Sequence, residues 1–152
     1  MSPTDSARTP KLIVVGIDGS DPSKEALIWA VDQARLTGAA LRVVMSWEIP
    51  SAAYMTPLPT GLDFDRDARQ VVDDEVREVL NESSDVEVEK VVVEGHPAPV
   101  LLAQSKDADL LVVGSRGHGQ FTGMLLGSVS EHCVSHATCP VVVVRHERHH
   151  KR

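Results

Sequence analysis

The feature of this sequence that most constrains its fold is a regular alternation of short apolar runs with amphipathic segments. Residues 11–17 (KLIVVGI) and 109–114 (DLLVVG) consist almost entirely of Ile, Leu, Val and Gly, and residues 140–144 (PVVVV) repeat the pattern. Continuous runs of this kind are typical of strands that are covered on both faces in a parallel sheet. The sequence therefore predicts several fully buried strands.

The segments between these runs carry apolar residues at helical spacing. The first begins with the turn and helix-start residues Asp21, Pro22 and Ser23, and Gly38 ends it. In the second, one apolar stripe faces a strongly charged side. The predicted helices span residues 21–37, 63–82, 98–105 and 128–136.

Two more strands and one long loop complete the expected order. Residues 41–47 form a strand, and residues 86–94 alternate apolar with acidic residues, as expected of a strand near a sheet edge. Residues 48–62 hold three prolines and a glycine and continue neither helix nor strand. With right-handed crossovers, this order predicts a single α/β domain whose parallel sheet carries helices on both faces.

In such sheets, ligands bind beyond the carboxyl ends of the strands, where the winding direction switches. The segments to search are therefore residues 16–20, 45–48 and 114–129.

Composition narrows the class of protein. The 152 residues carry 15 Lys and Arg against 22 Asp and Glu, a formal charge of −7, and only 3% of residues are aromatic. This balance argues against a nucleic-acid partner, which favours a basic or base-stacking surface. The apolar runs are far shorter than the ~20 residues that cross a bilayer, and the start lacks an apolar signal core. Together with the two cysteines, Cys133 and Cys139, these features lead us to expect a cytoplasmic protein and no membrane partner.

Glycine is concentrated in one loop after the strand at 109–114. Five of the ten glycines lie within the fourteen residues 114–127. Glycine lets a backbone approach a ligand closely, and the amides at a helix N-terminus attract anions, so phosphate is the natural ligand. The loop matches neither the P-loop, because Gln120 and Phe121 stand where Lys and Ser or Thr are required, nor the dinucleotide fingerprint, because Thr122 replaces the third glycine.

The spacing that does occur is Gly114, two residues, Gly117, nine residues, then Gly127 and Ser128. This pattern resembles the ATP-binding signature of the universal stress protein family. Similar to that family, too, are residues 14–20 (VVGIDGS), 46–48 (SWE), 95–98 (GHPA), 109–114 and 139–144 (CPVVVV).

The resemblance covers residues 11–145. It implies a Rossmann-like sheet of the adenine nucleotide alpha hydrolase type with strand order 3-2-1-4-5. We expect residues 1–10 to be a flexible N-terminus and residues 146–152 a solvated, basic, His-rich tail.

The resemblance also implies an adenine-nucleotide site, with ATP as the expected ligand. Around the adenine and ribose it places Ile17, Asp18 and Ser46. Around the ribose and phosphates it places Gly114, Arg116, Gly117, Gly127, Ser128 and Val129.

Three of these residues have alternative roles that the sequence leaves open. Ser128 would donate to a phosphate or cap the helix at 128–136. Arg116 would pair with a phosphate or be solvated. Asp18 would shape the turn before the first helix, contact the nucleoside, or approach the phosphates through a nucleotide-bound Mg²⁺ or Mn²⁺.

The function that the resemblance implies is that of a nucleotide-dependent stress-response regulator, which hydrolyses ATP slowly at most because no general base is evident. We expect no enzyme, and a homodimer through the last strand (Val141, Val142, Val143 and Val144). The alternatives are a cyclic-AMP-binding member of the family, a nucleotide-free dimeric scaffold, and an adenylating enzyme. Residues 18–23 do not supply the fuller Ser-Gly-Gly and Asp-Ser run that such an enzyme needs.

His132 and His136, with Cys133 and Cys139 close by in the sequence, form a grouping that could suggest a transition metal. The spacing matches no standard zinc signature. We expect these residues to occupy ordinary helix and loop positions.

Overall fold

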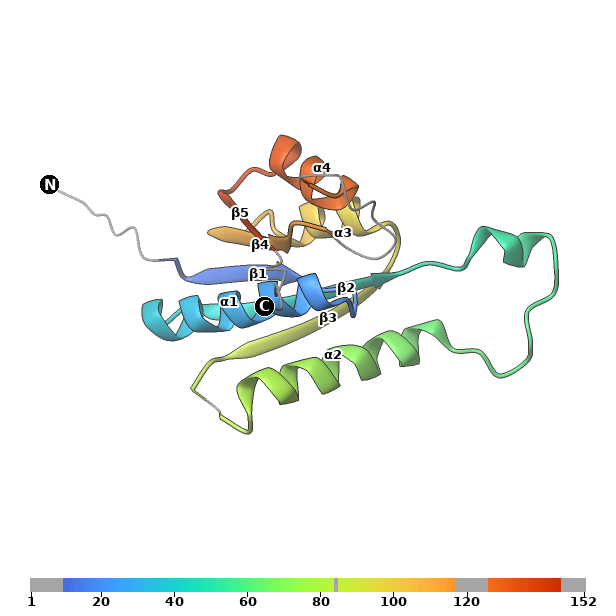
Figure 1. Ribbon diagram of the computed structural model, residues 1–152, viewed down its shortest axis with the longest axis horizontal. Coiled ribbons are helices and arrows are strands. Elements are labelled where there is room, and N and C mark those ends of the chain that lie inside the picture. Colours follow the sequence, from blue (N-terminus) through green and yellow to red (C-terminus); the bar gives the residue numbers. More distant parts are fainter. Residues whose placement is uncertain (1–9, 84, 117–125, 146–152) are drawn as a thin grey trace, which may run out of the picture.

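The computed structural model describes residues 10–83, 85–116 and 126–145, and it confirms the α/β architecture (Figure 1). All strands pair in parallel in one sheet of order β3-β2-β1-β4-β5, the predicted order. The strands are β1 (Leu12–Gly16), β2 (Ala40–Trp47), β3 (Val88–Glu94), β4 (Leu110–Gly114) and β5 (Val141–Val144). Most of the expected N-terminal segment, the tail after residue 145 and residues 117–125 of the glycine loop lie outside the described residues.

The winding of the sheet reverses between β1 and β4. From β1 the chain moves outward through β2 to the edge strand β3, and then returns to the other side of β1 to form β4 and β5. The carboxyl ends of β1 and β4 therefore flank the point where ligands bind in open α/β sheets. The strand at 86–94 lies at an edge as predicted, although β3 begins only at Val88 because Val86 packs into the core instead of pairing.

Two helices cover each face of the sheet (Figure 1). On one face lie α1 (Asp21–Thr37) and α2 (Phe64–Leu80), and on the other lie α3 (Pro97–Gln104) and α4 (Ser128–His136). β1 is apolar on both faces because both are covered. Ile13 and Val15 pack in the core under α1 and α2, and Val14 packs in the core under α3 and α4. All three side chains are fully buried.

Local signals in the sequence set the helix ends. The Ser20 side chain accepts the Ser23 N–H at the start of α1, and Gly38 ends that helix with φ +76°, where its N–H donates to Ala34 O at 2.8 Å. α3 starts at Pro97, one residue earlier than predicted, because a proline at the first helical position has no N–H to satisfy.

The segment 48–62, which we call the arm, extends away from the body (Figure 1). It contains a short 3₁₀ helix, η1 (Ser51–Tyr54), where the sequence predicted only loop. Its base is fixed: the rings of Trp47 and Phe64 stack with centroids 6.2 Å apart, and Trp47 Nε1 donates to Asp65 Oδ1 at 3.1 Å. Beyond the base, Tyr54 and Met55 are 79% and 87% exposed.

No helix within the described ranges is long and apolar enough to cross a membrane.

Glu75 on α2 is a partly buried carboxylate whose Oε1 atom is buried without a hydrogen-bond partner among the described groups. Burial raises its pKa above the ordinary 4.5, Lys24 opposes that rise, and the nearby Asp18 adds to it. A carboxyl with a raised pKa in the folded state holds its proton more tightly folded than unfolded, so stability falls as the pH rises from below 4.5 through the folded pKa.

We therefore expect Glu75→Gln to raise the Tm at pH 7 and to give no such gain below about pH 4, where the carboxyl is protonated in both states. Thermal unfolding across this pH range measures the effect. Glu87→Gln, which changes an exposed carboxylate, is the control and should show little change at either pH. A gain from Glu75→Gln that grew as the pH fell would contradict the explanation.

Candidate functional site

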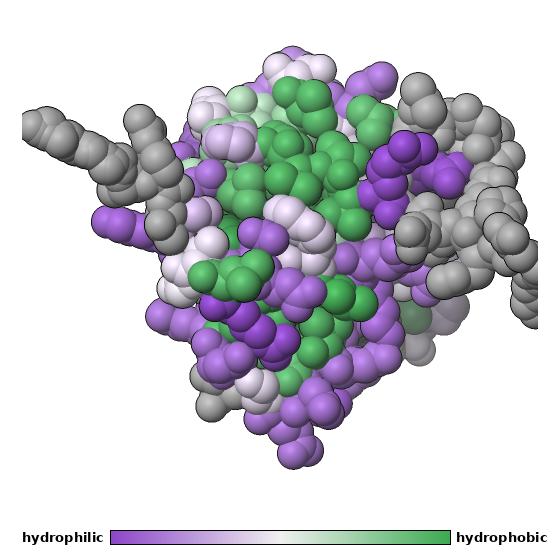
Figure 2. Space-filling view, turned by 60° about the vertical axis from the view of Figure 1, so that its left-hand side comes forward, coloured by the Kyte–Doolittle hydropathy of each residue, from purple (hydrophilic) through white to green (hydrophobic). Residues whose placement is uncertain are grey.

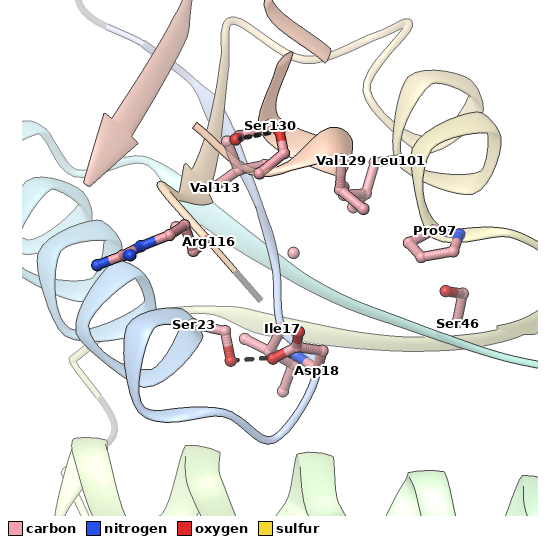
Figure 3. A pocket seen from close by; sticks show the side chains of 13 residues that line it. Ile17, Asp18, Ser23, Ser46, Pro97, Leu101, Val113, Arg116, Val129 and Ser130 are labelled. Atoms are coloured by element: carbon pink, nitrogen blue, oxygen red, sulfur yellow. Dashed lines mark hydrogen bonds between the residues drawn. The ribbon is translucent and has the colours of Figure 1, made fainter. Parts of the chain in front are cut away.

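A pocket of about 270 Å³ opens at the carboxyl ends of β1, β2 and β4, beside the starts of α3 and α4 (Figure 3). This size is near the lower end of the roughly 300–1,000 Å³ of typical ligand sites. The residues that line it are Gly16, Ile17, Asp18, Ser23, Ser46, Pro97, Leu101, Val113, Gly114, Arg116, Gly127, Val129 and Ser130.

The walls of the pocket are largely apolar. Ile17 follows β1, Leu101 comes from α3 and Val129 from α4, and Figure 3 shows these side chains around one space. Gly16 allows Leu101 to reach the sheet, because a Cβ at residue 16 would lie only 2.7 Å from Leu101 Cδ1. The arrangement provides apolar surfaces that a flat ring can contact.

Gly114 lies in a close approach between β4 and the start of α1. A Cβ at this position would lie 3.0 Å from the carbonyl oxygen of Pro22, in the first turn of α1. The glycine therefore lets α1 begin directly against the end of β4. This explains one glycine of the cluster by packing, whether or not a ligand also approaches it.

Asp18 occupies a turn between β1 and α1. Its Oδ1 atom accepts the Ser20 N–H at 2.9 Å and also the Ser20 hydroxyl, while its own N–H donates to Ser23 Oγ at 3.1 Å. Of the roles that the sequence left open, the turn role is therefore present. The same carboxylate also lines the pocket, so the turn role does not exclude contact with a ligand.

α4 begins at Ser128, as predicted, and the capping role left open for this residue is absent. Ser128 is not the N-cap: Gly127 occupies that position, no side chain caps the helix, and Ser128 is its exposed first residue. The first helical bond runs from the Glu131 N–H to Gly127 O at 2.9 Å. By helix geometry, the amides of residues 128–130 therefore have no partner within the helix, and amides in this position favour anions.

The structure brings most of the predicted site residues together. Ser128 is absent from the pocket lining, and Gly117 lies outside the described residues. In Figure 3, the Arg116 side chain extends toward the α1 side of the pocket, away from Pro97 and Ser46. The predicted residues that line the pocket are Ile17, Asp18, Ser46, Gly114, Arg116, Gly127 and Val129.

Sequence reasoning missed several lining residues, of which Ser130 and Pro97 carried a usable signal. Ser130 stands two residues after the glycine-loop signature, and Pro97 belongs to the family-like segment 95–98. Leu101 and Val113 carried none, because they are apolar like the core around them.

The His and Cys residues of α4 lie away from this pocket's lining. The rings of His132 and His136 stack with centroids 4.4 Å apart, and burial raises the pKa of the Cys133 thiol to about 11. Within the described ranges, no group of three or more His, Cys, Asp or Glu side chains is placed to hold a metal ion. Cys133 is thus a protonated core residue on the α3 and α4 side of the sheet.

The family assignment follows from comparison of the whole domain. The model of the universal stress protein family matches residues 10–145. The chain belongs to this family. Its curated relatives include the universal stress protein Rv2005c of Mycobacterium tuberculosis, which is 40% identical over 136 residues, or 88% of this chain and 45% of the relative. The chain thus spans about half the length of the curated relatives that it matches.

Solved structures of the family share the fold. A universal stress protein in complex with cAMP is 28% identical, with a TM-score of 0.59, over 90% of this chain and 97% of that one. The universal stress protein of Archaeoglobus fulgidus in complex with dAMP has a TM-score of 0.63 and is 24% identical, over 88% of this chain and 97% of its own. The second likeness supports the fold alone.

Proposed function

We propose that this protein binds an adenine nucleotide, with ATP as the main ligand, in the pocket between β1 and β4, and that it acts as a nucleotide-dependent regulator of the stress response. The observation that carries the proposal is that residues at the ends of β1, β2 and β4 and at the start of α4, to which the family resemblance gives this role, line one pocket at the switch point of the sheet. The expected compartment is the cytoplasm.

The two chemical halves of a nucleotide match the two parts of the pocket. The base and ribose would lie against Ile17, Leu101 and Val129, where apolar surface is removed from water. The phosphates would face the uncapped start of α4, whose amides and positive dipole end favour anions. The outer phosphates of a nucleoside triphosphate would extend beyond this compact pocket.

A divalent cation fits this site only as a companion of the nucleotide. Among the described lining residues Asp18 is the only carboxylate, and its Oδ1 already accepts two hydrogen bonds from Ser20. Mg²⁺ usually takes one or two carboxylates together with phosphate oxygens and water. Asp18 would therefore be the protein's contact to a Mg²⁺ or Mn²⁺ carried in by the phosphates.

Cyclic AMP is the second candidate ligand. The cAMP complex of a family member that is 28% identical to this chain favours it. The same apolar walls and the same α4 amides would serve its base and its cyclic phosphate.

We propose binding, not catalysis, as the activity. Among the described lining residues, no histidine is present, and the single carboxylate, that of Asp18, already accepts two hydrogen bonds from Ser20. Phosphoryl transfer to water needs a group that orients the attacking water and cations that stabilise the developing charge. Hydrolysis is expected to be slow at most, so that nucleotide occupancy, and not turnover, carries the signal.

Calorimetric titration of nucleotide-stripped protein tests the proposal. Stoichiometric binding of ATP, weaker without Mg²⁺, is the expected result. Tighter binding of cAMP than of ATP would move the function to cyclic-nucleotide sensing. If neither ATP nor cAMP bound, the remaining candidate function would be that of a nucleotide-free scaffold.

We further propose a homodimer through the free edge of β5. Figure 2 shows hydrophobic residues gathered in the upper part of one face, at the level of α4 and β5, and Val134 on α4 is 50% exposed. Ser115 N–H donates to Val144 O and Leu111 N–H to Pro140 O, so alternate residues of β5 face β4. The N–H and C=O groups of Val141 and Val143 consequently point to the open edge, as strand pairing requires.

Val143→Pro is therefore expected to weaken self-association at least about tenfold, because it removes an edge-facing donor and leaves the bonds to β4 in place. Sedimentation velocity over a range of concentrations measures this. Val92→Pro is the matched control, since the N–H of Val92 points out from the opposite edge strand β3. A dimer that resisted Val143→Pro would exclude this edge as the interface.

A further inference from the structure

We propose that Ser130 is a positioning residue for the nucleotide pocket. Its hydroxyl joins the two backbone ends between which the glycine-rich segment runs, and so fixes the α4 amides that face the phosphates. The proposal depends on the proposed function for its ligand, but the contacts that define it are independent of any ligand.

Two donors, the Gly127 N–H and the Ser130 hydroxyl, connect the two backbone ends. The chain leaves β4 at Ser115 and returns to the pocket at Gly127, whose N–H donates to Ser115 O at 2.6 Å. Ser130 Oγ lies 3.0 Å from Ser115 O and 3.0 Å from Gly127 O, so its one proton serves both carbonyls. Figure 3 shows this side chain beside the pocket. We call this arrangement of Ser115, Gly127 and Ser130 the clamp.

The clamp is buried and tied into the sheet. Ser130 is 2% exposed and Ser115 4%, so water cannot easily replace a lost hydrogen bond. The Ser115 N–H donates to Val144 O at 2.8 Å, which connects the clamp to β5 as well as to β4.

The clamp determines where the phosphate-binding amides stand. Gly127 is the N-cap of α4, so fixing its backbone against Ser115 fixes the first turn of the helix. Without the Ser130 hydroxyl, only a fraction of the molecules would have these amides in the binding position. The apparent affinity for a nucleotide would fall to that fraction of its value, and the loss would arise in the association step.

Ser128 and Ser130 point to different sides of α4, so that Ser128 is exposed and Ser130 is buried. The serine that turns inward is the one at the third helical position, and it bonds backbone carbonyls, as serines near helix N-termini often do. The buried hydroxyl, that of Ser130, therefore bonds to the backbone of Ser115 and Gly127.

The first experiment uses hydrogen exchange of the full chain without nucleotide. In Ser130→Ala, the protection of the Gly127 amide against exchange is expected to fall about tenfold, because the variant loses the net contribution of about one hydrogen bond. Ser135→Ala, which removes an exposed serine of the same helix, should leave that protection unchanged. Unchanged protection in Ser130→Ala would overturn the proposal.

The second experiment measures binding kinetics with a fluorescent N-methylanthraniloyl derivative of ATP. Ser130→Ala is expected to slow association about tenfold and to leave dissociation unchanged. A loss of affinity caused by faster dissociation would instead make Ser130 a direct ligand contact, and would overturn the positioning role.

The pair Ser130→Thr and Ser130→Val separates the hydroxyl from side-chain shape, since threonine and valine have nearly the same volume. Threonine is expected to bind about tenfold more tightly than valine. Equal affinities would overturn the proposal. If the unaltered protein bound no nucleotide, the proposed function would fail, while the exchange experiment would still test the clamp.

Discussion

Gly127→Val is expected to weaken ATP binding about 100-fold, which corresponds to about 2.7 kcal/mol, while the protein stays folded. Gly127 lines the pocket and is the N-cap of α4, so a branched side chain there would occupy space that the phosphates need. Its backbone has φ −77° and ψ 170°, a conformation that valine adopts readily. The substitution therefore changes the site without demanding a different backbone.

Calorimetry gives the affinity of this variant and thermal unfolding its stability. The Tm is expected to fall by about 3–6 °C with the transition still cooperative, because a branched side chain at a buried N-cap costs about 1–2 kcal/mol. Ser135→Val is the control, since it adds a branched residue to an exposed position of the same helix. Unaltered ATP affinity in a folded Gly127→Val variant would remove the start of α4 from the site.

Leu111→Ala is expected to destabilise the fold by about 2–5 kcal/mol and to lower the Tm by about 10 °C. Leu111 lies in β4, is fully buried, and packs with Val14, Val44 and Cys133 under α3 and α4. Removing its side chain leaves a cavity in a core that two helices and three strands share. The effect should extend to the pocket, because Val113 and Gly114 follow on the same strand.

Leu36→Ala provides the matched comparison for this prediction. Leu36 lies on α1 and is 79% exposed, so the same substitution there should change the free energy of unfolding by less than about 0.5 kcal/mol. Denaturant unfolding of both variants measures the difference. Similar losses at the two positions would mean that β4 does not lie at the centre of the core.

The features of the fold that could be predicted from the sequence are those determined locally, by residues close together in the chain. Gly38 ends α1 because a left-handed residue is needed there, and the apolar residues 11–17 can only be a strand with two covered faces. The strand order came instead from the resemblance to the family, because periodicity does not say which strands pair. The 3₁₀ turn η1 was missed because the prolines around it argued against any regular structure.

The site was predicted less completely, and the pair Ser128 and Ser130 shows why. Successive residues of a helix point about 100° apart, so a difference of one residue in where α4 begins decides which serine faces inward. The sequence offers both serines and does not indicate that Gly127 is the cap. Leu101 was missed for another reason: it reaches the pocket only because Gly16, distant in the sequence, leaves room for it.

The arm contrasts with the rest of the chain. Apart from Glu48 at its base, the arm contains no charged side chain, whereas 24% of the whole sequence is charged. Five of the exposed large hydrophobic residues are gathered there, on a segment whose base is held by Trp47: Ile49, Tyr54, Met55, Leu58 and Leu62. Because it leaves the body directly after β2, its base lies next to Ser46 at the pocket.

The measurement that tests the central claim most directly is an NMR titration of the ¹⁵N-labelled protein with ATP and Mg²⁺. If the nucleotide binds where we propose, the amide signals of Ile17, Ser46 and Val129 will shift together and saturate at one equivalent, while that of Tyr54 on the arm will change little. Shifts confined to other surfaces, or none at saturating ATP, would contradict the assignment of this pocket as an adenine-nucleotide site.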